Sequence, residues 1–358
     1  MVLAACTYQP LQVLINNKPI NTPPVIILAS CGLMAKLSLE ERMQLIRRNS
    51  AEIVTEEELA QLLQGKKKPI AYCGYEPSGE LHIGHLVTLF KLLDMEKAGF
   101  QVKILLADWH AWLNKKGDWK TIHESAKLYE KACRKIGFKN AKFFLGSKFQ
   151  RKQNYIDDVF MLALHTTINR GLRSMQEVAR DVENATISQT LYPLMQIADI
   201  KYLGADVAEA GLEQRKIHML ARETLELIKY KKPAFVHTPL INSLQGPGTK
   251  MSSSVPESFI SVRDSAEDIK NKINKAFCPE GIIENNPVLE ITKLIVFPKI
   301  TLLEINRPEK FGGAVSFGSY EALEKAFASK ELHPMDLKNA VAEKLAEILE
   351  PIRGEFRK

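Results

Sequence analysis

Two histidines lie close together in a short segment whose composition suits phosphate binding. His82 and His85 flank Ile83 and Gly84, shortly after the apolar run 70–75 and a turn-forming stretch at 76–79. A turn that follows a strand and opens a helix exposes unpaired backbone N–H groups, and the helix dipole adds positive charge there. Two imidazoles can donate further hydrogen bonds, and Gly84 lets a nucleotide ring approach the backbone. The same histidines could equally cap the helix or lie on the surface.

A second candidate segment lies far downstream, from Lys250 to Ser254. It combines one lysine with three serine hydroxyls and follows a loop that contains glycine. A lysine on such a loop can close over a triphosphate and neutralise the charge that develops as pyrophosphate leaves. In isolation, a solvated surface loop explains this segment equally well. Together with His82 and His85, it predicts nucleotide chemistry.

A stripe of polar side chains on one predicted helix indicates where a small polar ligand would bind. Tyr192, Gln196 and Asp199 fall on one face at helical spacing. Burying them in an apolar pocket is unfavourable unless each meets a partner, so they face a polar ligand or form a structural hydrogen-bond network. Together with Tyr72 at the end of a predicted strand, Asp199 can bind a phenolic hydroxyl. Gln214 joins Tyr192 and Gln196 as a candidate for holding an α-amino group.

These residues require a parallel sheet that brings strand ends together. Residues 70–75 and 101–107 are predicted strands, and a helix over about 85–98 joins them in a right-handed βαβ unit. Two amphipathic helices, around 39–46 and 59–63, are expected before the first strand. The chain from about 119 to 191 is expected to be a helical insertion with one strand at 142–145, and residues 235–241 return the chain to the sheet.

The predicted architecture is α/β, with a Rossmann-like parallel-sheet domain over 34–262 and an α-helical C-terminal domain over 263–358. Residues 1–33 are expected to be a weakly ordered leader, because helical periodicity begins only after Met34, a candidate start of the native chain. The apolar run that ends at Cys31 is too short, and lacks the basic flank, for a lipoprotein signal.

The composition excludes several classes of protein. The 358 residues are 45% apolar and 25% charged, which is typical of globular chains and not of disordered, fibrous or membrane proteins. No segment has the roughly 18 apolar residues that a membrane span needs. The net charge of +7 suits a polyanionic partner without requiring one. The five cysteines form no C-x-x-C pair, so we expect reduced thiols, a cytoplasmic protein and no metal site.

The early and late segments, in this order, resemble the HIGH and KMSKS motifs of class I aminoacyl-tRNA synthetases. Ser253 stands where the late motif often has a second lysine, a variant of archaeal and eukaryotic tyrosyl-tRNA synthetases that leaves Lys250 as its only lysine. The resemblance to that family covers about residues 40–358. It implies a tyrosine–tRNA ligase, in which ATP with Mg²⁺ activates L-tyrosine to tyrosyl-adenylate and the tyrosyl group passes to tRNA(Tyr). No tightly bound cofactor is implied.

The resemblance also implies roles for individual residues. Tyr72 and Asp199 would contact the tyrosine hydroxyl, and Tyr192, Gln196 and Gln214 would hold its amino group. Catalysis would rest on His82, His85 and Lys250. The residues implied to bind ATP are His82, Gly84, His85, Gly211, Glu213, Lys250, Ser252 and Ser253.

The same resemblance implies contacts with tRNA. Arg173 and Arg215 match positions that contact the acceptor stem, although solvated helix faces also carry such charges. Phe311 would stack on an anticodon base that His333 and Asp336 hydrogen-bond, which implies an anticodon-binding C-terminal domain. The stretch 333–336 is also explained as a helix start alone. The family further implies a homodimer formed through the helical insertion.

Three other functions stay open at this point. A tryptophanyl-tRNA synthetase would share fold and motifs but has no use for the hydroxyl-binding pair Tyr72 and Asp199. A non-catalytic RNA-binding protein derived from a synthetase would not need both nucleotide motifs. A nucleotidylyltransferase that acts without tRNA would not need the segment from His333 to Asp336.

Overall fold

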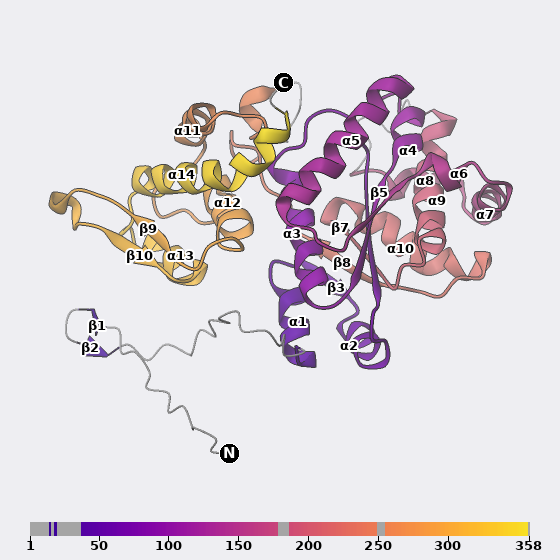
Figure 1. Ribbon diagram of the computed structural model, residues 1–358, viewed down its shortest axis with the longest axis horizontal. Coiled ribbons are helices and arrows are strands. Elements are labelled where there is room, and N and C mark those ends of the chain that lie inside the picture. Colours follow the sequence, from indigo (N-terminus) through magenta and orange to yellow (C-terminus); the bar gives the residue numbers. More distant parts are fainter. Residues whose placement is uncertain (1–13, 16–17, 20–36, 178–185, 249–254, 357–358) are drawn as a thin grey trace, which may run out of the picture. The chain divides into compact units, whose positions relative to one another are not determined.

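The computed structural model describes residues 14–15, 18–19, 37–177, 186–248 and 255–356 (Figure 1). The chain divides into two units, Met1–Lys36 and Leu37–Lys358. In the first unit, the described residues form two short strands, β1 (Leu14–Ile15) and β2 (Lys18–Pro19), which pair antiparallel. The rest of the expected leader over 1–33 lies outside the described residues.

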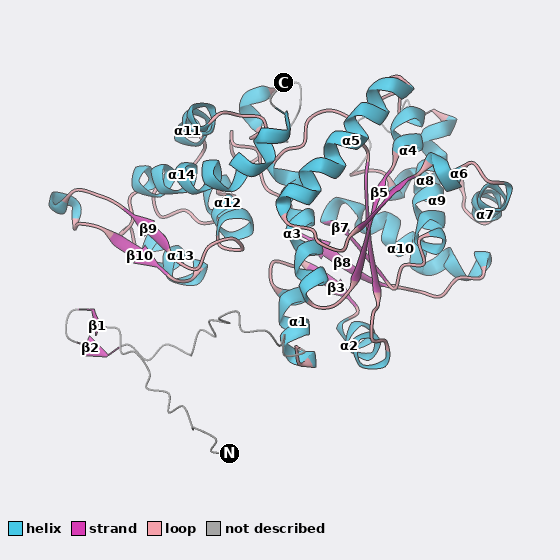
Figure 2. Ribbon diagram, viewed as in Figure 1, coloured by secondary structure: helices cyan, strands magenta, loops and turns pink. Residues whose placement is uncertain are grey.

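A six-stranded sheet forms the centre of the second unit, in the order β3-β8-β7-β4-β5-β6 (Figure 2). All neighbouring strands are parallel except β3, which pairs antiparallel with β8. The predicted α/β fold with a mostly parallel sheet is therefore confirmed. The strands are β3 (Glu52–Val54), β4 (Ile70–Tyr75), β5 (Gln101–Leu106), β6 (Lys142–Leu145), β7 (Val207–Gly211) and β8 (Ala234–Thr238).

A detail of the sheet differs from expectation. Its first strand is β3, which lies between the helices α1 (Leu39–Arg47) and α2 (Glu56–Gly65), so the prediction that both helices precede the first strand is wrong. A strand of three residues is too short to give an alternation pattern. In addition, β6 belongs to the main sheet, and α5 (Trp119–Ile136) is the crossover helix that connects it to β5. The predicted strand at 142–145 is therefore confirmed.

Helices cover both faces of this sheet. Successive strand residues point to opposite sides, so each strand contributes side chains to the packing on both faces. Cys73 and Ile104 pack into a core that includes α3 and α5, whereas Tyr72 and Leu105 pack into a second core with α7, α9 and α10. The helices and helical turns of this part are α3 (Ile83–Lys97), α4 (Asp108–Leu113), α6 (Ser147–Gln150), α7 (Gln153–Leu164), α8 (Ile168–Ser174), α9 (Ile187–Tyr202), η1 (Leu212–Gln214), α10 (Arg215–Thr224) and η2 (Leu225–Ile228).

The C-terminal part is mainly helical, as predicted, and also contains an antiparallel pair of strands. Its long helix α14 packs against α11, and Val341 and Leu345 of α14 join the same core as α3 and α5. The elements are η3 (Pro256–Ser258), α11 (Ala266–Lys275), α12 (Pro287–Ile291), η4 (Thr292–Val296), β9 (Leu303–Ile305), η5 (Glu309–Phe311), β10 (Val315–Phe317), α13 (Tyr320–Ala328), α14 (Pro334–Arg353) and η6 (Gly354–Phe356).

None of the helices in the described part of the chain is both long and apolar enough to cross a membrane. Cys73, Cys133 and Cys278 are buried and free, as predicted for reduced thiols. Cys6 and Cys31 lie outside the described residues.

Candidate functional site

A cavity of about 710 Å³ is lined by the ends of β4 and β7 and by the starts of α3 and α10, with α9 along one side. It brings together ten residues that the sequence singled out for tyrosine or nucleotide binding. These are Tyr72, His82, Gly84, His85, Tyr192, Gln196, Asp199, Gly211, Glu213 and Gln214. The other predicted nucleotide-binding residues, Lys250, Ser252 and Ser253, lie outside the described residues.

Asp199 is a buried carboxylate whose two oxygens differ. Its Oδ1 accepts hydrogen bonds from the Tyr155 hydroxyl at 2.9 Å and from Gln150 Nε2 at 2.8 Å. Burial raises the pKa of Asp199 to about 7, although these two hydrogen bonds lower it. Its Oδ2 accepts no hydrogen bond from the described residues and lies 3.8 Å from His110 Nε2. One oxygen is thus held by the protein, and the other has no hydrogen-bond donor among the described residues.

Gln150 also determines which ring nitrogen of His110 carries the proton. Gln150 Nε2 lies 3.2 Å from His110 Nδ1, so Nδ1 accepts, and the neutral ring carries its proton on Nε2. Burial lowers the pKa of His110 to about 4, which keeps the ring neutral. Burial, and after it the charge of nearby Asp199, raises the pKa of Tyr72. A donor on His110, the hydroxyl of Tyr72 and the free oxygen of Asp199 therefore surround one end of the cavity.

The region around Tyr192 contains a second carboxylate, that of the half-buried Glu76, which the sequence did not single out. Glu76 Oε1 accepts a hydrogen bond from Asn114 Nδ2 at 2.6 Å, and Glu76 and Tyr192 line the same cavity. Burial raises the pKa of Glu76. Gln214 Oε1 has no hydrogen-bond partner among the described residues. These oxygens are suited to an ammonium group.

His82 and His85 both take part in capping α3, which is one of the explanations that the sequence left open. His82 Nδ1 accepts from the backbone N–H of Gly84 at 3.1 Å, and His85 Nδ1 accepts from the backbone N–H of His82 at 3.2 Å. Burial lowers the pKa of His82 to about 4 and that of His85 well below its usual range. Each ring is therefore neutral and carries its proton on Nε2. The capping bonds use Nδ1 and leave two N–H donors at the start of α3.

Residues 259–262, which follow the lysine segment, lie beside the start of α3. The backbone N–H of Ile83 donates to Ile260 O, and that of Val262 donates to Leu81 O, both at 3.0 Å. The ring of Phe259 packs against His82 with 5.4 Å between centroids. Residues 259–262 are thus held against His82 and its neighbours Leu81 and Ile83.

The end of β7 carries two acidic side chains with oxygens that lack hydrogen bonds among the described residues. A Cβ on Gly211 would lie 2.2 Å from Glu213 Oε2, so glycine allows Glu213 to fold back over the strand end. Glu213 Oε2 and both carboxylate oxygens of buried Glu209 lack hydrogen bonds within the described ranges. Burial raises the pKa of both groups. Glu209 was missed, although a carboxylate inside an otherwise small and apolar strand is a signal that could have found it.

The two arginines predicted to bind the acceptor stem lie outside the main cavity. Arg215 begins α10 and donates to the two oxygens of Glu52 at 2.7 and 2.9 Å. Arg173 on α8 lines a smaller cavity of about 330 Å³ with Asn169 and Gln176. Neither arginine is among the residues that line the 710 Å³ cavity.

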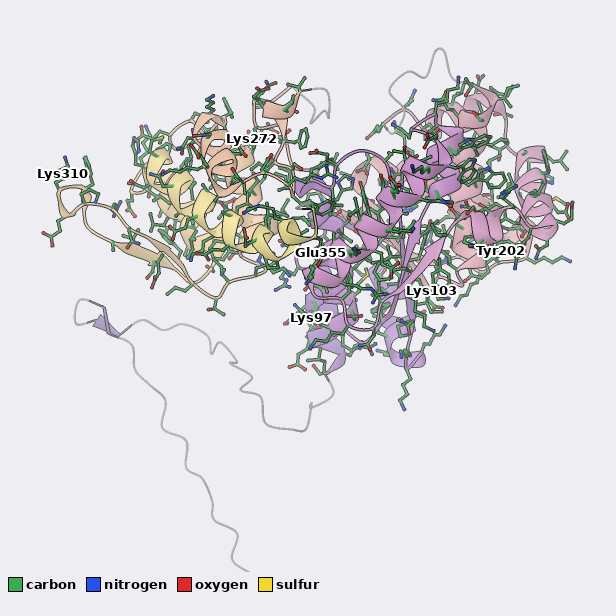
Figure 3. All side chains as sticks on the ribbon, turned by 45° about the horizontal axis from the view of Figure 1, so that its top comes forward. Lys97, Lys103, Tyr202, Lys272, Lys310 and Glu355 are labelled. Carbon is green, nitrogen blue, oxygen red and sulfur yellow. The ribbon has the colours of Figure 1, made fainter. Side chains whose placement is uncertain are left out.

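The predicted anticodon residues belong to the C-terminal part. Phe311 is 60% exposed, and the ammonium group of Lys310 lies 4.9 Å from its ring centroid. Lys310 is at the tip of the loop between β9 and β10 (Figure 3). His333 caps α14, with Nδ1 accepting from the backbone N–H of Met335 at 3.2 Å, and Asp336 lies in the first turn. The helix-start explanation of this stretch is therefore correct, and it leaves His333 Nε2 unused.

Comparison with known proteins identifies the family. The model of the class I tRNA synthetases for tryptophan and tyrosine (W and Y) matches residues 64–350. A tyrosine–tRNA ligase of Methanococcoides burtonii is 51% identical over 316 residues, which cover 88% of this chain and 99% of that one. The crystal structure of tyrosyl-tRNA synthetase complexed with L-tyrosine from Archaeoglobus fulgidus has 48% identity and a TM-score of 0.86, over 89% of this chain and 100% of that one.

A tryptophanyl-tRNA synthetase from Giardia lamblia matches with a TM-score of 0.68 at 18% identity, over 90% of this chain and 86% of that one, and so shares the fold alone. The tyrosine–tRNA ligases of Archaeoglobus fulgidus and Methanocaldococcus jannaschii are 48% and 50% identical to this chain over 88% and 87% of its length. The chain therefore belongs to the archaeal-type tyrosine–tRNA ligases of the class I aminoacyl-tRNA synthetase family.

Proposed function

We propose that the 710 Å³ cavity is where this tyrosine–tRNA ligase activates L-tyrosine with ATP and from which it charges tRNA(Tyr). The carrying observation is that ten predicted tyrosine- and ATP-binding residues line this one cavity. The tyrosine carboxylate attacks the α-phosphate of ATP, and pyrophosphate leaves. The terminal ribose hydroxyl of tRNA then attacks the carbonyl carbon of the adenylate, and AMP leaves. No protein nucleophile is needed, so the side chains act by positioning and charge stabilisation.

At one end of the cavity, Asp199 Oδ2 accepts a hydrogen bond from the substrate hydroxyl, and the Tyr72 hydroxyl is its second contact. Phenylalanine would leave this buried oxygen without a donor, which costs about 1–3 kcal/mol. At the other side of the amino acid, Tyr192, Gln196 and Gln214 hold the ammonium group. The unpartnered oxygen of Gln214 supports this assignment.

The nucleotide lies at the start of α3. His82 and His85 donate their Nε2–H groups to phosphate oxygens, and Gly84 admits the nucleotide next to the backbone. Gly211 and Glu213 hold the ribose hydroxyls, which is supported by the unpartnered Glu213 Oε2.

Positive charge must come from elsewhere, because both imidazoles are neutral. Lys250 supplies it as pyrophosphate leaves, and the hydroxyls of Ser252 and Ser253 assist. Mg²⁺ enters with ATP as part of the substrate. No group of three His, Cys, Asp or Glu side chains in the described part of the chain would hold a resident metal ion, and imidazole N–H donors suit phosphate oxygens and not a cation.

Residues 34–262 form the catalytic domain and 263–358 the anticodon-binding domain. Arg173 and Arg215 contact the acceptor stem, where charge and base-edge hydrogen bonds combine. Phe311, which is 60% exposed, stacks on an unpaired anticodon base, and His333 and Asp336 hydrogen-bond that base. The free Nε2 of His333 supports this role, because Nδ1 is already used in capping.

A symmetric homodimer forms through the helical insertion. Four large apolar side chains on α7 and α8 are exposed by 41–79%, namely Phe160, Met161, Leu164 and Ile168. A cluster of this kind is typical of a protein interface, and a second copy of the chain can cover it symmetrically. The enzyme acts in the cytoplasm, which is supported by the free thiols of Cys73, Cys133 and Cys278.

Two variants test whether the catalytic domain carries out amino-acid activation while the anticodon-binding domain serves tRNA charging. Lys250→Ala should slow tyrosine-dependent ATP–pyrophosphate exchange by about 100-fold, because one charge that stabilises the transition state is lost, while tyrosine affinity stays unchanged. Asp336→Ala should impair tRNA charging and leave the exchange rate intact. Normal exchange in Lys250→Ala would remove that lysine from the mechanism. Equal losses in both assays for Asp336→Ala would indicate misfolding and not a tRNA contact.

A further inference from the structure

Four side chains form a continuous hydrogen-bonded chain from the cavity to the protein surface. His218 lines the cavity, and its Nδ1 lies 3.0 Å from His237 Nε2. His237 Nδ1 lies 3.1 Å from Glu52 Oε2. Glu52 accepts two hydrogen bonds from Arg215, whose side chain is 45% exposed. Both histidines are fully buried.

The fold holds each link of this chain. Glu52 on β3 is the register partner of His237 on β8. Arg215 and His218 lie one turn apart on α10. The ring of Phe235 packs against His218 with 4.7 Å between centroids. The four hydrogen-bonded side chains therefore connect β3, the antiparallel edge strand, to α10. The first residue of α10, Arg215, directly follows Gln214, which we propose binds tyrosine.

The carboxylate sets the direction of the hydrogen bonds. The guanidinium of Arg215 lowers the pKa of Glu52, so Glu52 is ionised and can only accept. His237 Nδ1 must then carry the proton, and His237 Nε2 accepts from His218 Nδ1–H. Burial lowers the pKa of both histidines, so both rings are neutral. His218 is left with Nε2 as a hydrogen-bond acceptor.

We propose that this chain couples tRNA bound at Arg215 to the ligand in the cavity, with His218 and His237 as positioning residues. The proposal rests on the proposed function, which assigns Arg215 to the acceptor stem. A tRNA phosphate or base edge that binds the guanidinium of Arg215 withdraws it from Glu52. The uncompensated carboxylate then polarises His237 and His218 more strongly, since charges act at short range in a buried hydrogen-bond chain.

The consequence is tighter binding of the intermediate, tyrosyl-adenylate. A more strongly polarised His218 Nε2 is a better acceptor for an ammonium or ribose hydroxyl group of tyrosyl-adenylate. Binding of tRNA therefore tightens adenylate binding, and adenylate tightens tRNA binding by the same factor, because coupling free energies are reciprocal. The enzyme would thus hold the reactive intermediate most firmly when its acceptor is present.

A second arginine–carboxylate pair on the same helix provides a matched control. Arg222 of α10 donates to Glu58 of α2 at 2.7 and 2.8 Å. Neither side chain lines the cavity, and neither hydrogen-bonds a histidine among the described residues. Loss of this pair removes a similar link between α10 and the N-terminal helices without interrupting the histidine chain.

The test measures the affinity of the sulfamoyl analogue of tyrosyl-adenylate with and without saturating tRNA(Tyr). In the wild type and in Glu58→Ala, tRNA should tighten analogue binding by about fivefold or more. Glu52→Ala and His237→Phe should bring this ratio to about one. His237→Gln should retain it, since the amide can donate to Glu52 and accept from His218 as the imidazole does.

A ratio of about one in the wild type, or an unchanged ratio in Glu52→Ala, would overturn the coupling. Arg215→Ala distinguishes this failure from that of the proposed function. Unchanged tRNA affinity in Arg215→Ala would contradict the tRNA contact itself. Weaker tRNA binding in Arg215→Ala, together with a wild-type ratio in Glu52→Ala, would refute only the coupling through the four hydrogen-bonded side chains. The tRNA contact of Arg215 would still stand. If thermal unfolding shows that His237→Phe is not folded, the affinity ratio of Glu52→Ala decides the test, because the Glu52 side chain is partly exposed.

Discussion

The two ends of the cavity satisfy their polar groups in different ways. At the phenol end, Asp199 Oδ1 has two protein partners, Tyr155 and Gln150. At the nucleotide end, oxygens of Glu209 and Glu213 have none within the described residues. An acceptor that buried hydrogen bonds hold in place cannot turn away from a wrong substrate, so we propose that the phenol end selects the amino acid. At the nucleotide end no protein donor among the described residues holds these oxygens, so we propose that the ligand completes them, because unpaired buried oxygens are unfavourable until a donor arrives.

Removal of the carboxylate at the phenol end should have the largest effect. Asp199→Ala should lower kcat/KM for tyrosine in pyrophosphate exchange by about 100-fold, or about 3 kcal/mol, the upper range for a hydrogen bond to a charged group. Preference for tyrosine over phenylalanine should fall in parallel. Asp158→Ala is the control, because Asp158 pairs with Lys201 at 2.5 Å outside the cavity. Undiminished discrimination in Asp199→Ala would mean that selection occurs elsewhere.

At the nucleotide end, Gly211→Ala should act on ATP alone. The added Cβ would lie 2.2 Å from Glu213 Oε2 and push that carboxylate away from the strand end. We expect KM for ATP to rise about tenfold, equivalent to one hydrogen bond to a charged group, and tyrosine affinity to stay constant. Gly65→Ala, where a Cβ meets nothing within 4 Å, is the control. A rise in KM for tyrosine would show that the two ends are not independent.

The protonation of Asp199 provides a pH test of the phenol end. Its pKa is raised to about 7, and in the proposed function the ionised form accepts the substrate hydroxyl. Tyrosine affinity should therefore fall about fivefold from about pH 7 to about pH 6, as the carboxylate takes up a proton. Isothermal titration of tyrosine binding at several pH values, with proton release measured alongside, checks this. A flat profile would place the pKa of Asp199 well below that range.

The smallest effect is expected for a residue that acts through Asp199. Tyr155→Phe removes a hydrogen bond that lowers the pKa of Asp199, so the pH midpoint for tyrosine binding should move upward. KM for tyrosine should rise about threefold at neutral pH, consistent with loss of one ordinary hydrogen bond. Tyr202→Phe, a neighbouring tyrosine whose ring lies 5.0 Å from that of Tyr155, is the control. An unshifted midpoint would assign Tyr155 a packing role only.

The sequence predicts those parts of the site that depend on local order. His82, Gly84 and His85 lie within four residues, and their strand, turn and helix context is visible in the apolar pattern. Tyr192, Gln196 and Asp199 share a face because helical spacing alone brings them together. For the same reason, the βαβ unit of β4, α3 and β5 was predicted within a few residues.

Contacts between distant segments were not predictable in this way. Gln150 and Tyr155 reach Asp199 across 49 and 44 positions, and no periodic pattern connects them. Glu52 meets His237 across 185 positions, and its strand of three residues is too short for alternation to identify. The partners that orient the predicted residues therefore follow from tertiary packing and not from local patterns.

The most direct measurement of the central claim is ATP–pyrophosphate exchange by the purified wild-type chain with each of three amino acids. We expect exchange with L-tyrosine and little or none with L-phenylalanine or L-tryptophan, because only tyrosine offers a hydroxyl to Asp199 Oδ2. Exchange with tryptophan at a comparable rate, or no exchange with any of the three, would contradict the proposed role of the cavity.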